Sequence, residues 1–312
     1  MPAASILIKP ASANCNMDCK YCFYKCLSSH REEYSKGFMK EETLETLVRE
    51  AIAYADGSLT FAFQGGEPTL AGLDFFQKAV ELQQKYNNKK LQIENTIQTN
   101  GLLIDEKWAR FLGEHRFLVG LSLDGPKKMH DRYRNDAAGQ DTFARIMHSV
   151  QLLEQYHVDY NVVTVVTNDT AKQASFLYKF WKRNHYPFVQ FIPCMDEIKR
   201  QDGTQERSIY AVEPEQYGKF LCELFDLWYA DFVAGEAMDI RMFSNLAQMA
   251  AGYPAEECGM NGCCNCYFVV EGDGSVYPCD FYCMDAWKLG NVNDGFVQMK
   301  TSEKAKAFVE AS

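Results

Sequence analysis

Short segments rich in β-branched and aromatic residues alternate with longer amphipathic segments along most of this chain. Six segments are predicted as strands: residues 5–9, 58–64, 91–98, 117–123, 160–166 and 188–192. Six others are predicted as helices: residues 41–55, 73–86, 105–114, 142–156, 170–184 and 214–234. Strands that alternate with helices form a parallel sheet with right-handed crossovers. Six units are fewer than a closed eight-fold barrel requires, so we expect an open (β/α)6 barrel.

Polar and glycine-rich segments follow the predicted strands, each at the point where its strand ends. They are residues 15–22, 65–68, 98–101, 122–126, 167–168 and 193–196. The carboxyl ends of parallel barrel strands lie on one face, where such folds place their chemistry. We therefore expect these segments to meet at one mouth of the barrel.

Three closely spaced cysteines, Cys15, Cys19 and Cys22, follow the first predicted strand in a C-x3-C-x2-C pattern. A structural zinc site closes its shell with four protein ligands. Three thiolates on a [4Fe–4S] cluster instead leave one iron without a protein ligand, and that iron can bind a small molecule and pass it an electron. The pattern favours an iron–sulfur cluster over the alternative of buried or zinc-binding cysteines.

A second group of cysteines lies near the end of the chain, after a change of character at residue 234. Its members are Cys258, Cys263, Cys264, Cys266, Cys279 and Cys283. An Asp-Gly turn at residues 272–274 predicts a hairpin of residues 267–271 and 275–277. We therefore expect a barrel of residues 1–234 and a small cluster-binding appendage of residues 235–312. Paired C-x2-C units typical of zinc knuckles are missing from this group, but spacing alone does not assign its ligands.

Charge and cysteine content narrow the function classes. The 312 residues carry a formal net charge of -10, which argues against nucleic acid or an anionic membrane as the main partner. No signal peptide and no apolar run of membrane-spanning length is seen, so we expect a cytoplasmic protein. Its 12 cysteines then indicate metal binding or catalysis rather than disulfides. Cys222, in an apolar helical pattern, is the exception and is expected in the core.

Several single residues at the expected mouth are candidates for binding. Gly65 and Gly66 allow the backbone to approach a ligand closely, and Glu67 offers a carboxylate. Ser122 and Asp124 end the fourth predicted strand, either as an ordinary polar terminus or as cofactor contacts.

Two charged residues have more than one interpretation. Arg134 can pair with a carboxylate of a cofactor or peptide, or form a surface salt bridge. Asp280 directly follows Cys279 and is either a hydrogen-bonding turn residue or, if buried at the mouth, a general base.

Taken together, these motifs resemble those of the anaerobic sulfatase-maturating enzymes, which are radical S-adenosylmethionine (radical SAM) proteins with a C-terminal SPASM or twitch-type domain. The resemblance is carried by residues 7–12, 15–24, 61–72, 98–101, 118–126, 258–262 and 275–282. The cysteine motif alone marks the superfamily, whereas the segments around Gln64 and Asp280 are more specific. The implied fold is a partial (β/α)6 TIM-like barrel with a small, incomplete cluster-binding appendage.

The resemblance also implies a reaction. The cluster at Cys15, Cys19 and Cys22 reduces S-adenosyl-L-methionine, and the resulting 5′-deoxyadenosyl radical takes a hydrogen atom from Cβ of a cysteine or serine in a sulfatase. Asp280 matches the base that deprotonates this side chain, and the product is Cα-formylglycine. Flavodoxin or ferredoxin is the implied electron donor.

Residue roles follow from the same resemblance. The four residues Gly65, Gly66, Glu67 and Pro68 match the motif that binds the amino group of the cofactor. The strand end with Ser122 and Asp124 lies beside its methionine and ribose, and Arg134 is a further cofactor candidate. Tyr24 and Gln64 match positions near the substrate peptide. The implied ligands of a first auxiliary [4Fe–4S] cluster are Cys258, Cys264 and Cys279.

One departure from the family pattern concerns the end of the chain. The cysteine-rich segment that supplies a second auxiliary cluster does not follow, so we expect that cluster to be absent, with S-adenosyl-L-methionine cleaved but sulfatase matured poorly. Cys263, Cys266 or Cys283 is a candidate fourth ligand of the first auxiliary cluster. Two alternatives remain: a SPASM-type peptide-modifying enzyme that forms thioether or carbon–carbon bonds, and a catalytically silent iron–sulfur protein.

Overall fold

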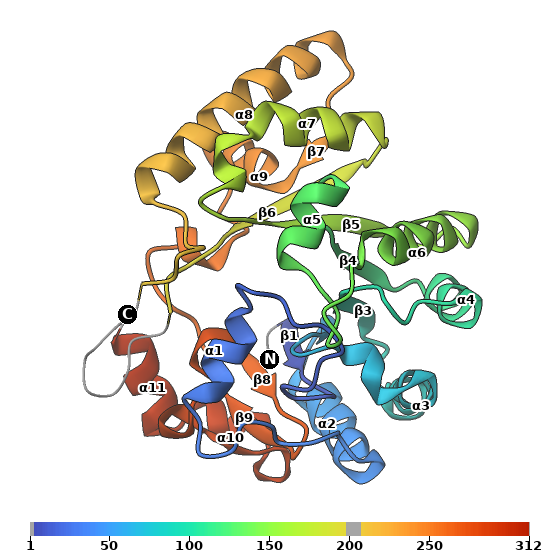
Figure 1. The fold of residues 1–312 in the computed structure, drawn as a ribbon. Coiled ribbons are helices and arrows are strands. Elements are labelled where there is room, and N and C mark those ends of the chain that lie inside the picture. The colour runs from blue at the N-terminus through green and yellow to red at the C-terminus, as the bar shows by residue number, and fades with distance from the viewer. Residues whose placement is uncertain (1–2, 198–206, 312) are drawn as a thin grey trace.

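A single sheet of ten strands organises the computed structural model, which describes residues 3–197 and 207–311. The strand order is β10-β9-β8-β1-β2-β3-β4-β5-β6-β7, and the sheet curves into an open barrel (Figure 1). Six parallel strands form its centre: β1 (Ala4–Ile8), β2 (Ser58–Phe63), β3 (Gln92–Thr99), β4 (Leu118–Ser122), β5 (Tyr160–Val166) and β6 (Phe188–Pro193). The predicted open (β/α)6 arrangement is confirmed.

Helices cover the outer, convex side of this sheet (Figure 1). They are α2 (Glu41–Tyr54), α3 (Leu73–Tyr86), α4 (Glu106–Glu114), α6 (Phe143–Gln155), α7 (Ala174–Arg183) and α8 (Pro214–Ala234). Local signals define several ends: Asp105 caps α4 by accepting from Trp108 N at 2.9 Å, and Gly235 ends α8 with φ 76°. The predicted helix 170–184 is divided, because Gln173 leaves helical geometry between η2 (Thr170–Lys172) and α7.

Short elements and one core residue differ from the sequence predictions. The helices α1 (Phe23–Ser29) and α5 (Lys127–Tyr133) were not predicted, because seven residues are too few to show helical periodicity. The strand β7 (Asp239–Ile240) and the helix α9 (Arg241–Ala250) also follow α8. The prediction that Cys222 lies in the core is wrong: it is exposed, because α8 turns Phe220 and Leu224 inward.

The C-terminal segment continues the barrel sheet. β8 (Phe268–Val270) and β9 (Ser275–Tyr277) form the predicted antiparallel hairpin, and β8 also pairs in parallel with β1. β10 (Gly290–Asn291), α10 (Phe296–Lys300) and α11 (Glu303–Glu310) follow. The domain boundary after residue 234 stays a prediction, since the sheet passes through both parts. The β1–β8 pairing brings the C-terminal loops to the barrel mouth.

Aromatic side chains fill the space between the sheet and its helices. The ring of Phe63 lies 4.9 Å from that of Phe76 on α3, and Phe76 lies 5.1 Å from Trp108 on α4. Each such ring is almost fully buried, which contributes about 1.5–3 kcal/mol per side chain. This packing holds the strands from which the loops at the mouth emerge. Within the described residues, no helix is both long and apolar enough to cross a bilayer.

Candidate active site

The buried carboxylate of Glu67 joins the loops that follow β2 and β3. Glu67 caps η1 (Pro68–Ala71), where its Oε1 accepts a backbone hydrogen bond at 3.0 Å. The same oxygen accepts from Thr99 Oγ1 at 2.7 Å, and Oε2 accepts from Asn100 N at 2.8 Å. Asn100 in turn donates to Asn16 Oδ1, 2.7 Å away in the loop after β1. Burial raises the pKa of Glu67. Three of the predicted loop segments therefore do meet at one mouth.

The first cysteine group lies in the loop between β1 and α1. The Cys15 Sγ accepts from Met17 N at 3.4 Å, and Cys19 Sγ accepts from Arg134 Nη1 at 3.8 Å. Cys22 is the N-cap residue of α1. Donors directed at sulfur stabilise the negative charge of thiolates and tune the clusters that they bind.

The positions of these three thiols are compatible with a cluster. Across residues 3–197 and 207–311, no three His, Cys, Asp or Glu side chains converge as ligands of one metal ion. The cysteines of a cluster bind different irons, so their sulfurs need not converge on one point. Burial raises the pKa of Cys15 to about 11 and that of Cys19 to about 12, so binding iron must displace their protons. The loop therefore fits a cluster with three thiolate ligands.

Gly65 and Gly66 lie where other parts of the chain approach so closely that a side chain would not fit. Both have positive φ, 84° and 51°. A Cβ on Gly66 would lie 2.3 Å from Asn14 O, and a Cβ on Gly65 would lie 2.6 Å from Lys9 Cγ. Glu67 N donates to Asn14 O at 2.8 Å and holds the two loops together. Contact of these glycines with a cofactor stays a prediction.

Asp124 and Arg134 form a buried ion pair on one side of the cysteine loop. Arg134 Nε lies 3.0 Å from Asp124 Oδ2, which also accepts from the Tyr21 hydroxyl. Asp124 Oδ1 accepts from Val165 N on β5 at 3.0 Å. Arg134 is buried and its guanidinium joins Asp124 to Cys19, so it forms no surface salt bridge; its contact with a cofactor stays a prediction.

Ser122 lies at the end of β4 and accepts a hydrogen bond from Gln98 Nε2 at 3.1 Å. Gln98 comes from the neighbouring strand β3 and passes over Gly120, where a Cβ would lie 2.1 Å from its Oε1. Contact of Ser122 with a cofactor stays a prediction.

Tyr24, Gln64 and Asp280 come from distant parts of the sequence and lie together on the other side of the cysteine loop. The Tyr24 hydroxyl donates to Asp280 Oδ2 at 2.7 Å and accepts from Gln64 Nε2 at 2.6 Å. Asp280 N donates to the Tyr267 hydroxyl at 3.0 Å. Asp280 is only 7% exposed. The burial that a general base at the mouth requires is present, whereas the role itself stays a prediction.

Sequence reasoning missed three charged residues beside Asp280. Lys9 Nζ lies 2.8 Å from Asp280 Oδ1 and 3.7 Å from Glu271 Oε1, and Arg31 Nη2 lies 2.7 Å from the same Glu271 oxygen. The available signal was a lysine at the end of an apolar strand. The partners of this lysine depend on which strand lies beside its own. The local sequence pattern does not predict that neighbour.

The second cysteine group divides by exposure. Cys258, Cys263 and Cys264 are exposed, whereas Cys266, Cys279 and Cys283 are buried. Cys279 lies close enough to Cys258 and to Cys266 for electrostatic interaction. Cys283 packs instead in a small apolar cluster with Leu7 and Tyr277. Of the predicted auxiliary ligands, Cys279 is thus buried and near Cys258, and the ligand roles stay predictions.

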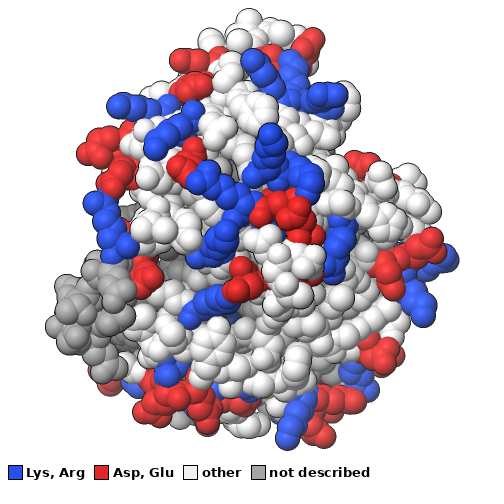
Figure 2. All heavy atoms as spheres, viewed as in Figure 1, with Lys and Arg blue, Asp and Glu red and all other residues white. Residues whose placement is uncertain are grey.

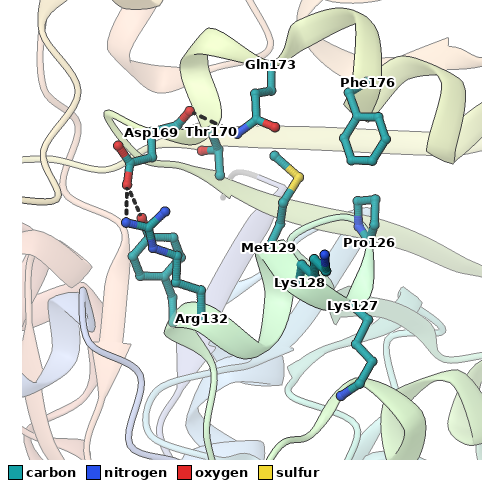
Figure 3. Close-up of a pocket in the computed structure, with 10 residues that line it drawn as sticks. Pro126, Lys127, Lys128, Met129, Arg132, Asp169, Thr170, Gln173 and Phe176 are labelled. Carbon is teal, nitrogen blue, oxygen red and sulfur yellow. Dashed lines mark hydrogen bonds and ion pairs between the residues drawn. The ribbon is translucent and has the colours of Figure 1, made fainter.

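A separate cavity of about 390 Å³ lies between α5 and the η2–α7 segment (Figure 3). Arg132 and Asp169 form an ion pair of 2.8 Å at its edge, and Met129 and Phe176 contribute apolar surface. None of the predicted site residues lines it. Figure 2 shows basic and acidic side chains interspersed on the face that carries α5, so the net charge of -10 is not spread as a uniformly acidic surface.

Family models agree with this arrangement. The radical SAM superfamily model matches residues 10–179, and the SPASM iron–sulfur cluster-binding model matches residues 261–312. The parallel barrel, the cysteine loop and these matches define a radical SAM enzyme with a SPASM region. The predicted cofactor class of iron–sulfur cluster and S-adenosyl-L-methionine is thereby confirmed.

More closely related proteins narrow the class. A cysteine-type anaerobic sulfatase-maturating enzyme of Clostridium perfringens is 50% identical over 94% of this chain and 79% of its own length. A serine-type enzyme of Bacteroides thetaiotaomicron is 34% identical over 97% of this chain and 76% of its own length. The solved structure of native anSMEcpe with bound AdoMet and Cp18Cys peptide matches with a TM-score of 0.93 and 46% identity, covering 99% of this chain and 83% of that chain. The chain belongs to the anaerobic sulfatase-maturating enzymes.

Proposed function

We propose that this chain oxidises a cysteine of a sulfatase polypeptide to Cα-formylglycine. The observation that carries the proposal is the buried group of Asp280, Tyr24 and Gln64 beside the cysteine loop. We propose cysteine rather than serine as the substrate residue because the chain is 50% identical to the cysteine-type relative and 34% identical to the serine-type relative.

The residues at the mouth fit the cofactors that this reaction needs. Cys15, Cys19 and Cys22 would hold the [4Fe–4S] cluster, with Arg134 and Met17 donating to two of their sulfurs. The residues that would contact S-adenosyl-L-methionine are Gly65, Gly66, Glu67, Pro68, Ser122 and Asp124. When bound, these cofactors supply a 5′-deoxyadenosyl radical that removes a hydrogen atom from the substrate Cβ.

The chain's own residues supply the proton transfer. Asp280 accepts the proton of the substrate thiol, while the Tyr24 hydroxyl donates to Oδ2 and orients the carboxylate. Gln64 fixes that hydroxyl by donating to it. Loss of one hydrogen atom, one proton and one electron is a two-electron oxidation of the side chain, and water then replaces sulfur, which leaves as sulfide.

The remaining electron needs an exit and the cluster needs a donor. The exit would be an auxiliary cluster held by Cys258, Cys264 and Cys279, which directly precedes Asp280. Flavodoxin or ferredoxin remains the proposed donor, and the cytoplasm the proposed location.

The test is an anaerobic reaction of the reconstituted chain with S-adenosyl-L-methionine, a reductant and a sulfatase-derived peptide containing cysteine. A matched serine peptide is run in parallel. We expect 5′-deoxyadenosine and formylglycine, read by chromatography and mass spectrometry, with the cysteine peptide converted faster. No 5′-deoxyadenosine would overturn the radical reaction, and a thioether or carbon–carbon product would identify another type of peptide modification.

A further inference from the structure

Two cations and two carboxylates form a buried charge group beside the cysteine loop: Lys9, Arg31, Glu271 and Asp280. Their exposed fractions are 2%, 8%, 0% and 7%. Charges that leave water at this depth are costly unless they are paired. The two signs balance here, and Lys9 is the member that contacts both carboxylates.

Strand pairing creates this charge group. The last residues of β1 and β8, Ile8 and Val270, are partners across the parallel pair. Lys9 and Glu271 follow them directly, and Lys9 N donates to Val270 O at 2.8 Å. The hairpin then returns the chain so that Asp280 lies against the Lys9 ammonium at 2.8 Å.

Gly65 makes room for the lysine. A Cβ at this position would lie 2.6 Å from Lys9 Cγ and 2.8 Å from Lys9 Cδ, so the lysine stem occupies the space that any other residue would need. The same position has φ 84°, which also favours glycine. Gly65, a glycine of the predicted cofactor motif, therefore leaves space for the side chain of Lys9, which follows the neighbouring strand β1.

Lys9 and Tyr24 bracket the cysteine loop, and both hold Asp280. Lys9 directly follows β1, before the loop, and Tyr24 lies in α1, after it. The ammonium faces Oδ1, which has no aligned hydrogen bond among the described residues, and the tyrosine hydroxyl bonds Oδ2. Lys9 Nζ also lies 4.6 Å from the centre of the Tyr24 ring, a cation–π contact. The carboxylate is thus placed relative to both ends of the loop that carries the three cysteines.

We propose that Lys9 is a positioning residue that holds the Asp280 carboxylate where it can accept the proton of the substrate thiol, and that Gly65 leaves the space that Lys9 needs. The inference rests on the proposed function, because it takes Asp280 as the base. Although burial opposes it, the Asp280 carboxylate raises the pKa of Lys9 above its ordinary value, so Lys9 remains an ammonium. It acts by holding Asp280 and not by moving a proton itself.

The activity test uses the reconstituted enzyme with Lys9→Met, which keeps an unbranched side chain one atom shorter and removes its charge. We expect formylglycine formed per 5′-deoxyadenosine to fall about 10- to 100-fold, because a misplaced base slows the step that follows hydrogen abstraction. The peptide KM should stay within about threefold, and Lys9→Arg should restore part of the ratio. Lys78→Met, which removes a partly exposed lysine paired with Glu41 on the outer surface, is the matched control and should keep the wild-type ratio.

The space argument has its own test on the cluster-free chain, read by thermal unfolding. Gly65→Ala should lower the unfolding midpoint by several degrees, and by clearly less in a Lys9→Ala background, since the clash with the lysine stem is then gone. Gly66→Ala is the control: its Cβ would meet Asn14 O, so its shift should be the same in both backgrounds.

The outcomes separate this inference from the proposed function. If the wild-type chain makes no formylglycine, the proposed function fails, while the unfolding comparison still tests the contact between Lys9 and Gly65. An unchanged product ratio in Lys9→Met, or equal Gly65→Ala shifts in both backgrounds, would overturn the inference. If Lys9→Met does not fold, Gly65→Ala takes its place and must itself lower the ratio.

Discussion

Two groups of similar chemistry flank Cys22 but differ in what they contact. On one side Tyr21 bonds Asp124, which pairs with Arg134. On the other side Tyr24 bonds Asp280, which pairs with Lys9. In both groups the cation also lies over the tyrosine ring, at 5.5 Å and 4.6 Å from its centre.

The difference lies in the third partner. Arg134 reaches Cys19 Sγ, so the first group supports the loop expected to make the radical. Lys9 reaches Glu271 in the C-terminal segment, so the second group joins the barrel to the segment that carries Asp280. The comparison teaches that one loop is held by two ion pairs, one beside a predicted cluster ligand and the other beside the proposed base. Variants should therefore separate radical formation from product formation.

The largest effect is expected from Cys19→Ala, which removes one proposed cluster ligand from the loop that both groups hold. Without its third thiolate the cluster should not form, so 5′-deoxyadenosine and formylglycine should both fall below detection. Iron content and product analysis check this. Cys222→Ala changes an exposed cysteine on α8 and should leave both products unchanged, whereas a wild-type iron content in Cys19→Ala would contradict the assignment.

Asp280→Asn should break the second group alone. Formylglycine should fall about 10²- to 10⁴-fold, as for loss of a general base, while 5′-deoxyadenosine is still made in the presence of peptide. The matched variant is Asp124→Asn in the first group, for which both products should fall in the same proportion. Equal ratios of the two products in both variants would show that the groups do not have separate roles.

Arg134→Met tests the structural cost of breaking the first group. Asp124 would remain buried without its partner, which destabilises a protein by about 3–5 kcal/mol. Urea unfolding of the cluster-free chain measures this, and Arg132→Met, which changes an exposed arginine in the helix just before Arg134, is the control. A loss below about 1 kcal/mol would mean that the pair adds little beyond a surface salt bridge.

The smallest effects should come from the two tyrosines. Tyr24→Phe and Tyr21→Phe each remove one hydroxyl and one hydrogen bond to a buried carboxylate, worth about 1–3 kcal/mol. Tyr24→Phe should lower the formylglycine to 5′-deoxyadenosine ratio several-fold, whereas Tyr21→Phe should leave this ratio unchanged. A lower ratio of formylglycine to 5′-deoxyadenosine in Tyr21→Phe would contradict separate roles for the two groups.

Long elements with strong local signals were predictable. The strand at Tyr160–Val166 and the helices at Leu73–Tyr86 and Pro214–Ala234 have the predicted bounds, because burial patterns and caps are properties of neighbouring residues. The cysteine loop was predictable for the same reason, since its spacing lies within a few residues. The helices α1 and α5 were missed because each has only seven residues.

Tyr24, Gln64 and Asp280 could be named before the structure was known, but only as separate motifs. The contacts of Lys9 could not be predicted, because they depend on β8 lying beside β1, more than 250 residues away in the sequence. Charged residues at strand ends are common, and only the neighbouring strand decides whether one is solvated or buried.

The sequence by itself determined the parallel barrel, the three-cysteine loop and the hairpin that precedes Asp280, because each rests on short-range patterns of apolar, glycine and cysteine residues. Only the tertiary structure decided which carboxylate faces which cation. Arg134 proved to hold Asp124 and Cys19, and Gly65 proved to make room for Lys9. The physical reason is that ion pairing and close packing act between atoms in contact, and chain distance places no limit on which atoms come into contact.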